Sequence, residues 1–276
     1  MTTDELNEKY ERLRRLIDGY GSLLVAYSGG VDSTLLLKVA HDVLGDRVLA
    51  VTAASPTYPG AEQEAAVALA ARLGVRQVTI ETDELEIAGF ADNPPERCYF
   101  CKGELFGQLQ QIARAEGIAH VVDGANADDA GDYRPGMQAA GELGVVSPLL
   151  EAGLTKDDVR ALSKRFGLET WDKPSAACLA SRFPYGETIT REKLAMVESA
   201  ERFLTGLGFR QVRVRHHGTI ARIEVAPDEI ERLASAAVRD QVTRALTDIG
   251  YSYVTIDCRG YRTGSLNEVL SQDENL

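Results

Sequence analysis

The sequence predicts an α/β fold, in which a parallel sheet carries helices on both faces and a smaller C-terminal α+β domain follows. Short apolar runs alternate with helical segments from Leu23 to Asp123, and this alternation implies right-handed crossovers between parallel strands. The first run ends at a glycine-rich turn that opens a helix, at the edge of the sheet where such folds bind ligands. Beyond Thr188 the order of helices and strands becomes less regular. We therefore expect two domains, at residues 1–187 and 188–276.

The composition and the N-terminal segment are typical of a globular cytoplasmic protein. Of the 276 residues, 44% are hydrophobic and 26% are charged, and the net charge of −12 disfavours non-specific binding to nucleic acid. Met1–Asp18 predicts an amphipathic helix with Leu6, Tyr10, Leu13 and Ile17 on one face, and it lacks the apolar core of a signal peptide. No apolar run approaches the roughly 20 residues that cross a membrane. Four cysteines without an export signal predict reduced thiols in the cytoplasm.

The glycine-rich turn lies in the stretch LLVAYSGGVDST, residues 23–34. A short apolar run bounded by glycine predicts a buried parallel strand, and Leu35–Val43 predicts the helix that follows. The two glycines allow a tight turn and a close approach to a ligand, and the helix N-terminus presents N–H groups to an anion. Ser28 and Ser33 add hydroxyl donors, and Asp32 adds a carboxylate for a hydrated cation. The stretch predicts a phosphate cradle without the lysine of a Walker loop; the alternative is a turn whose serines only cap the helix.

The other elements of the first domain bring more loops to the same edge. Because carboxyl ends of parallel strands meet at one edge, the loops that begin at Ser28, Ala54 and Asp123 should share a crevice. Thr155 starts a later helix, with Asp158 in the capping-box position. We expect strands at Arg47–Ala54, Val75–Glu81 and Ala119–Asp123, and helices at Ala61–Leu73 and Lys102–Glu116.

The second domain is predicted as a mixture of helices and strands. We expect a helix at Arg191–Leu207, strands at Gln211–His216, Thr219–Val225 and Tyr253–Asp257, and helices between Pro227 and Ile249.

The pattern SGGxDS at Ser28–Ser33 resembles the PP-loop of the ATP pyrophosphatases. The resemblance implies an adenine nucleotide alpha-hydrolase-like fold, whose loop binds ATP with Mg²⁺, releases pyrophosphate and leaves AMP on a substrate. It identifies the superfamily and not the substrate. It implies a catalytic role for Asp32 and a nucleotide site made of Ser28, Gly29, Gly30, Asp32, Ser33, Ala53, Gly124 and Asp128.

The cysteines indicate a second kind of chemistry. Cys98 and Cys101 stand about one turn apart at the entry to a helix, where they suit a redox dithiol, half of a zinc site or two ligands of an iron–sulfur cluster. Zinc usually takes four ligands, and the sequence holds no second CxxC. With Cys178, three cysteines would leave one iron of a [4Fe-4S] cluster open to sulfur or substrate; the alternative for Cys178 is a small buried hydrophobe. We expect Cys258 to serve packing.

The segments DGANADDAGDYRPG, SRFPYG and VRVRHHGTIARIE together resemble LarE, a family of PP-loop sulfur transferases. The resemblance spans roughly Leu24 to Asn267. It implies that ATP adenylates a pyridinium biscarboxylate mononucleotide and that sulfur then converts its carboxylates to thiocarboxylates, in biosynthesis of the nickel-pincer nucleotide cofactor of lactate racemase. It also implies a homo-oligomer, with other nickel-pincer biosynthesis proteins and a sulfide donor as partners.

The cysteine positions depart from part of that family. Well-known LarE members give up the sulfur of a single cysteine, which becomes dehydroalanine, and they lack the CxxC pair. Aligned on SRFPYG, that position is Ala177 here, and the cysteine falls one place later at Cys178. The chain instead resembles the LarE branch whose three cysteines bind a [4Fe-4S] cluster that carries the transferable sulfide. This implies Cys98, Cys101 and Cys178 as catalytic cluster ligands.

Charged residues complete the expected site. Asp128, Asp129 and Asp132 match the acidic loop of the family, beside Tyr133 and Arg134. The alternative for them is a solvated surface.

Three arginines are candidates for the phosphate of the nucleotide substrate: Arg182, Arg213 and Arg215. Alternation along a strand puts Arg213 and Arg215 on one face; the alternative is a salt-bridged exposed face. His216 and His217 lack metal-ligand spacing to another His or Cys.

The expected mechanism follows from charge. A carboxylate is a poor electrophile because its leaving group would be an oxide. Attack on the α-phosphate of ATP gives an acyl adenylate with AMP as a good leaving group, while Mg²⁺ neutralises the departing pyrophosphate. A cluster-bound sulfide would then attack the activated carbonyl.

Three other functions compete with this one. The enzymes of tRNA 2-thiolation also pair a PP-loop with cysteines, but the acidic balance and the absence of an RNA-binding extension argue against them. Amide formation by GMP or NAD synthetases gives no reason for three cysteines in the crevice loops. The third alternative is a nucleotide-binding module without catalysis.

Overall fold

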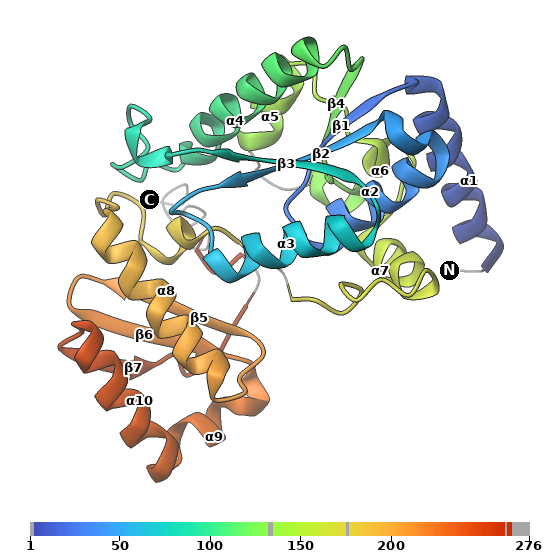
Figure 1. The fold of residues 1–276 in the computed structure, drawn as a ribbon. Helices are drawn as coiled ribbons and strands as arrows, with labels where there is room; N and C mark the ends of the chain where they lie inside the picture. Colours follow the sequence, from blue (N-terminus) through green and yellow to red (C-terminus); the bar gives the residue numbers. More distant parts are fainter. Residues whose placement is uncertain (1–2, 132–134, 175–176, 263, 267–276) are drawn as a thin grey trace. The chain divides into compact units, whose positions relative to one another are not determined.

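The computed structural model describes residues 3–131, 135–174, 177–262 and 264–266 (Figure 1). The chain divides into two compact units, the first made of Met1–Phe90 and Pro95–Ala176 and the second of Ala91–Pro94 and Ala177–Leu276. This division falls upstream of the boundary predicted near residue 187, because the loop before that point packs within the second unit. There the Gly186 N–H donates to the carbonyl of Asn93.

The first unit is built on a four-stranded parallel sheet in the order β3-β2-β1-β4, which confirms the predicted fold class. Its strands are β1 (Leu23–Ala26), β2 (Val48–Ala54), β3 (Arg76–Glu81) and β4 (His120–Val122). Its helices are α1 (Thr3–Tyr20), α2 (Val31–Leu44), α3 (Gly60–Arg72), α4 (Arg97–Ala115), α5 (Pro135–Glu142), α6 (Pro148–Glu151) and α7 (Lys156–Arg165), with short 3-10 turns η1 (Gly45–Arg47), η2 (Glu84–Glu86) and η3 (Ala127–Gly131).

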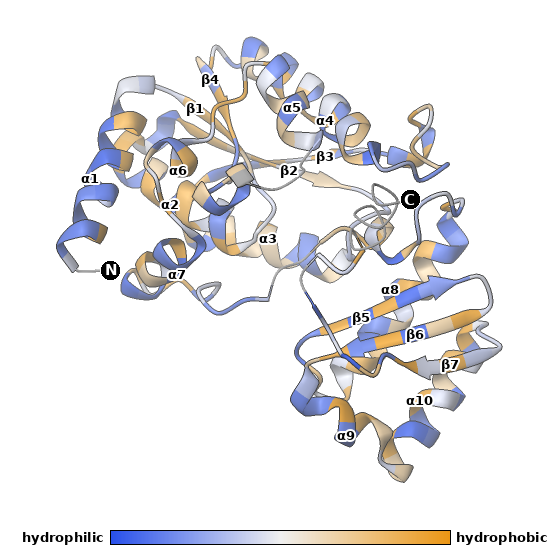
Figure 2. Ribbon diagram, turned by 180° about the vertical axis from the view of Figure 1, so that it is seen from behind, coloured by the Kyte–Doolittle hydropathy of each residue, from blue (hydrophilic) through white to orange (hydrophobic). Residues whose placement is uncertain are grey.

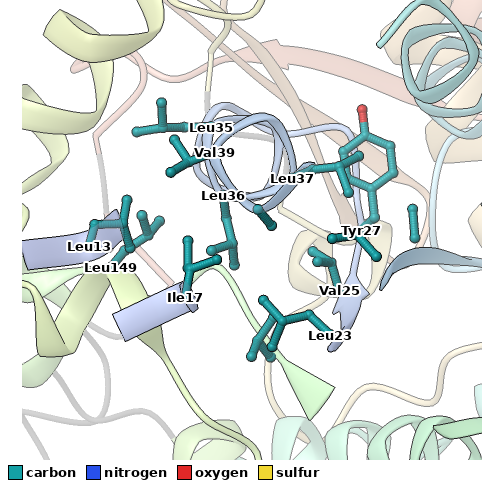
Figure 3. Packing of buried hydrophobic residues seen from close by; sticks show 14 of the residues in the cluster. Leu13, Ile17, Leu23, Val25, Tyr27, Leu35, Leu36, Leu37, Val39 and Leu149 are labelled. Carbon is teal, nitrogen blue, oxygen red and sulfur yellow. The ribbon is translucent and has the colours of Figure 1, made fainter. Parts of the chain in front are cut away.

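Alternate residues of the central strands enter two different cores. Leu23 and Val25 of β1 pack with α1, α2, α6 and α7, whereas Leu24 packs with α4 and α5 on the opposite face. This is the period of two that a pleated strand imposes. In Figure 3, Leu36 points from α2 toward the space between Ile17 of α1 and strand β1. The near-continuous apolar strands are therefore explained by a sheet covered on both faces.

The second unit contains a three-stranded sheet, in the order β5-β6-β7, with helices packed on one face. Strand β6 pairs antiparallel with β5 and parallel with β7. Val214 and Ile223 face the core that α8 and α10 complete. The elements are η4 (Leu179–Arg182), α8 (Arg191–Gly206), β5 (Val212–His217), β6 (Ile220–Val225), η5 (Pro227–Glu229), α9 (Ile230–Ala234), α10 (Ala236–Ile249) and β7 (Tyr253–Ile256).

Two features of the helices differ from the sequence-based expectation. Helix α4 begins at Arg97, five residues before the predicted start, directly after the Pro94–Pro95 pair that blocks an earlier helix. Helices α5 and α6 were not predicted; α6 is a single turn with Pro148 at its first position, where proline needs no N–H partner. The consequence is that the CxxC pair lies inside the first turns of α4 rather than before them.

The N-terminal helix has the predicted amphipathic character. Leu13 and Ile17 are fully buried, and Figure 2 shows hydrophilic and hydrophobic residues alternating along α1, as an amphipathic helix requires. Within the described residues, no helix combines the length and the apolar content needed to cross a membrane.

The apolar core between α2, α1 and strand β1 should contribute much of the stability of the first unit. Replacing the fully buried Leu36 with Ala removes apolar contacts and leaves a cavity, so we expect a loss of about 2–5 kcal/mol in the free energy of unfolding. Leu143→Ala is the matched control, because that side chain is 36% exposed and its loss should cost well under half as much. Urea titration measures both values; equal losses would contradict this description of the core.

Candidate functional site

The loop between β1 and α2 has the backbone of a phosphate cradle. Gly29 has φ +68°, which L side chains rarely adopt, and a Cβ added there would lie 2.7 Å from the Cβ of Ala66 on α3. Gly29 is therefore needed both for its conformation and for the close packing of α3 against the loop. Gly30 occupies the N-cap of α2, and no side chain caps that helix. The N-terminal N–H groups of α2 thus point at the loop with the positive end of the helix dipole, which suits an anion.

Two serine hydroxyls fix the shape of the loop. Ser28 Oγ lies 3.1 Å from Ser33 Oγ, and the Ser33 hydroxyl also donates to the carbonyl of Gly30 at 3.3 Å. Ser28 is exposed whereas Ser33 is buried. The exposed hydroxyl is available to a phosphate oxygen, while the buried one holds the turn.

Asp32 lies at the centre of a polar network in the first unit. Its Oδ1 accepts from the side-chain amide of Asn126 at 3.2 Å, and its Oδ2 accepts from Lys156 Nζ. The backbone N–H of Lys156 donates to Asp128 at 2.8 Å. This brings a lysine ammonium group to a cradle whose sequence lacks the lysine of a Walker loop. The carboxylate of Asp32 fits the oxygen ligands that Mg²⁺ prefers.

The structure also places the remaining predicted nucleotide residues at this edge of the sheet. A Cβ on Gly124 would lie 3.0 Å from the backbone nitrogen of Ser33, so the loop after β4 approaches the PP-loop closely only because residue 124 is glycine. Ala53 is half-buried at the end of β2. Asp128 is exposed on η3. Of the predicted acidic loop, Asp132, Tyr133 and Arg134 lie outside the described residues.

Sequence reasoning missed three residues of this site: Lys156, Asn126 and Lys173. Lys173 Nζ donates to the carbonyl of Gly29 at 3.1 Å and pairs with Glu62 at 2.6 Å. The capping box at Thr155 marked the start of α7 and hence the position of Lys156 on its first turn. Nothing local indicates that Lys156 meets a residue 124 positions earlier.

The CxxC pair lies on the first turns of α4. Cys98 is exposed and Cys101 is half-buried, and their i, i+3 spacing puts both thiols on neighbouring positions of one helix face. Two accessible thiols on one turn fit the donor set of an iron–sulfur cluster. Across the described ranges, no three His, Cys, Asp or Glu side chains gather into a metal site. Cys258, expected to serve packing, is exposed after β7, so that expectation is wrong.

In the second unit, Cys178 lies at the N-cap of η4 in a turn held by Arg182. The carbonyl of Cys178 accepts from Arg182 Nη1 at 2.9 Å and from the Ser181 hydroxyl at 2.8 Å. Arg182 is 2% exposed and forms a two-point ion pair with Glu201, with both distances 2.9 Å. The half-buried thiol of Cys178 therefore sits on a fixed turn.

The two arginines of β5 share the sheet face opposite the helices. Arg215 binds Glu224 through two nitrogens, at 3.0 and 2.7 Å, and Arg213 lies over the ring of Tyr261. Both arginines are almost buried, so they do not form an exposed salt-bridged face. Burial and then the neighbouring charge of Arg182 lower the pKa of Arg213 to about 10. An anion bound at Arg213 would offset the repulsion between the positive charges of Arg213 and Arg182.

Comparisons with known proteins show the family to which the chain belongs. The chain matches the NAD synthase family over residues 7–110. It is 43% identical to the pyridinium-3,5-bisthiocarboxylic acid mononucleotide synthase of Lactiplantibacillus plantarum, over 90% of each chain. The chain belongs to the LarE family. An uncharacterised protein of Synechocystis is 46% identical over 97% of this chain and all of its own length.

Membership of the LarE family confirms the resemblance drawn from the loop motifs. A tRNA-specific 2-thiouridylase of Rickettsia felis is 28% identical over 67% of this chain and 61% of its own. The higher identity and fuller coverage of the LarE relative favour that family over tRNA thiolation.

Gly29 is the position at which the cradle should be most sensitive. Gly29→Ala introduces a Cβ at positive φ against Ala66, so we expect Mg-ATP affinity to fall at least about fivefold, since the conformation alone costs roughly 1–2 kcal/mol. Gly141→Ala is the control, because an added Cβ meets nothing within 4 Å on α5. Isothermal titration calorimetry measures both; equal affinities would refute the cradle.

Proposed function

We propose that this protein is an ATP-dependent sulfur transferase that converts the carboxylates of a pyridinium biscarboxylate mononucleotide to thiocarboxylates, for nickel-pincer nucleotide biosynthesis. The observation that carries the proposal is the 43% identity, over 90% of each chain, to a synthase whose name states the bisthiocarboxylic product. That product requires two things of the chain: activation of a carboxylate and delivery of sulfur.

The PP-loop supports the activation half. The helix N-terminus and Ser28 bind the phosphates, and Lys156 neutralises charge that develops on the leaving pyrophosphate. Asp32 is the residue to hold Mg²⁺, which would shield the phosphate charge when bound. Ala53, Gly124 and Asp128 bound the same nucleotide site. Attack of the substrate carboxylate at the α-phosphate breaks the bond to pyrophosphate and gives an acyl adenylate.

Three thiols support the sulfur half, as ligands of a [4Fe-4S] cluster: Cys98, Cys101 and Cys178. When bound, the cluster would supply sulfide from an iron that has no protein ligand. The chain's own contribution is to hold the thiolates: α4 presents the CxxC pair on one turn, and Arg182 fixes the turn that carries Cys178. Sulfur addition to the acyl adenylate and loss of AMP give the thiocarboxylate.

The second domain is proposed to bind the substrate and to form the oligomer. Arg213 and Arg215, with Arg182, supply cationic donors for the phosphate of the mononucleotide. We propose a cytoplasmic homo-oligomer that meets a sulfide donor and other nickel-pincer biosynthesis proteins. The small nucleotide substrate and the net charge of −12 speak against nucleic acid as a partner.

The reaction itself is the first test. Incubation with Mg-ATP and pyridinium-3,5-biscarboxylate mononucleotide should release pyrophosphate and AMP and give a thiocarboxylate detectable by mass spectrometry. Unmodified tRNA serves as the competing substrate and should give no thiolated product. Thiolated tRNA without thiocarboxylate would replace this proposal with tRNA thiolation, and nucleotide binding without pyrophosphate release would indicate a binding module.

The cluster is tested separately from the activity. Protein purified without oxygen should contain about four irons and about four sulfides per chain, or about five sulfides when the open iron carries the transferable one, and Cys101→Ala should lose most of the iron and the sulfide. Cys258→Ala is the matched control, because that exposed thiol lies outside the proposed ligand set, and it should keep full iron content. Unchanged iron in Cys101→Ala, or dehydroalanine at residue 178 after turnover, would overturn the cluster.

A further inference from the structure

We infer that Lys9 and Asp158 are positioning residues for Lys156, so that the N-terminal helix is part of the ATP site. The inference rests on the proposed nucleotide site and is independent of the sulfur chemistry. It concerns an ion pair between α1 and α7, formed by the buried Asp158 and the half-exposed Lys9, that the proposed reaction does not use.

A single carboxylate oxygen joins the two helices. Asp158 is fully buried, and its Oδ2 accepts from Lys9 Nζ at 2.6 Å and from the backbone N–H of Thr155 at 3.0 Å. The Thr155 hydroxyl accepts in turn from the Asp158 N–H at 3.3 Å, which completes a capping box. Any shift of Lys9 is thus transmitted to the first turn of α7.

Lys156 is the first residue of that turn. Its backbone N–H binds Asp128 and its Nζ binds Asp32. Both contacts depend on where α7 starts, because the helix start fixes the direction of the N–H and the origin of the side chain. An open capping box would release the turn and move the ammonium group away from the phosphate cradle.

Packing of α1 against α7 does not need this ion pair. Tyr10 and Phe166 have ring centroids 5.3 Å apart, and Arg165 donates to Asn7 at 2.7 Å. Leu13 and Leu162 share one apolar core. An ion pair removed from water contributes little net stability beside such contacts. The pair between Lys9 and Asp158 is therefore better explained by the position that it gives to the start of α7 than by the packing of α1 on α7.

The pair also keeps Asp158 ionised. Burial alone would raise the pKa of this carboxyl, but hydrogen bonds from Lys9 and Thr155 outweigh burial and hold it below the usual value. The carboxylate therefore stays an acceptor for the Thr155 N–H at neutral pH.

The experiment measures the affinity of the full-length protein for Mg-ATP by calorimetry. Asp158→Ala should weaken binding about tenfold, the scale of a lost helix cap. Asp158→Asn should lose less, because its amide oxygen still accepts from Thr155. Asp157→Ala is the matched control: it removes the same charge from the same turn at an exposed position, and its affinity should stay within about twofold of wild type.

A double-mutant cycle separates positioning from a structural role. In a Lys156→Met background, Asp158→Ala should weaken ATP binding no further, because its effect acts through Lys156. Additive losses would overturn the inference. Lys9→Met repeats the test at a half-exposed position should Asp158→Ala unfold, and Lys9→Arg should restore affinity. Wild-type protein that binds Mg-ATP but makes no thiocarboxylate would refute the proposed function alone.

Discussion

The candidate ATP site depends on two close approaches, each made possible by a glycine on one of the two segments in contact. Gly29 lets α3 pack against the PP-loop, and Gly124 lets the loop after β4 reach the start of α2 at Ser33. Neither approach leaves room for a Cβ at the glycine, so the cradle is formed by the PP-loop, the loop after β4 and helix α3 together. The parallel sheet makes this possible because it delivers the carboxyl ends of β1, β2 and β4 to one edge.

Charge is organised locally in a chain whose net charge is −12. Lys156 and Lys173 lie at the PP-loop, where each is also held by a carboxylate, Asp32 or Glu62. The carboxylates hold the ammonium groups in place. A phosphate could still bind them, because it would compete with the carboxylate as an acceptor of the same N–H groups. Two ammonium groups beside one loop give that loop a local positive charge that would attract an anionic nucleotide in spite of the net negative charge.

Local signals in the sequence predicted most of the fold, and contacts distant in sequence account for what was missed. The run from Leu23 through the SGGxDS motif predicted the order strand, turn and helix, because sterics and capping act over a few residues, although α2 begins at Val31, four residues before the predicted start. Alternation also predicted one face for Arg213 and Arg215, but their burial depends on Glu224 from β6 and on Tyr261. Lys156 escaped prediction for the same reason, since its partner Asp32 lies in another element. The missed start of α4 has a local cause: the turn after Pro95 lacks a side-chain cap.

Glu201 contacts both parts of the second unit to which a function is proposed, the Cys178 turn and strand β5. Its carboxylate holds Arg182, which fixes the Cys178 turn, and its Oε1 also accepts from the backbone N–H of Val214 at 2.8 Å. Val214 lies between the two arginines of β5. A single half-buried carboxylate therefore aligns the turn that carries Cys178 with the strand proposed to bind the substrate phosphate. Since the geometry of both parts depends on one acceptor, a change at Glu201 would disturb the proposed sulfur delivery and the proposed substrate binding together, whereas changes at the PP-loop would affect the proposed activation of the carboxylate first.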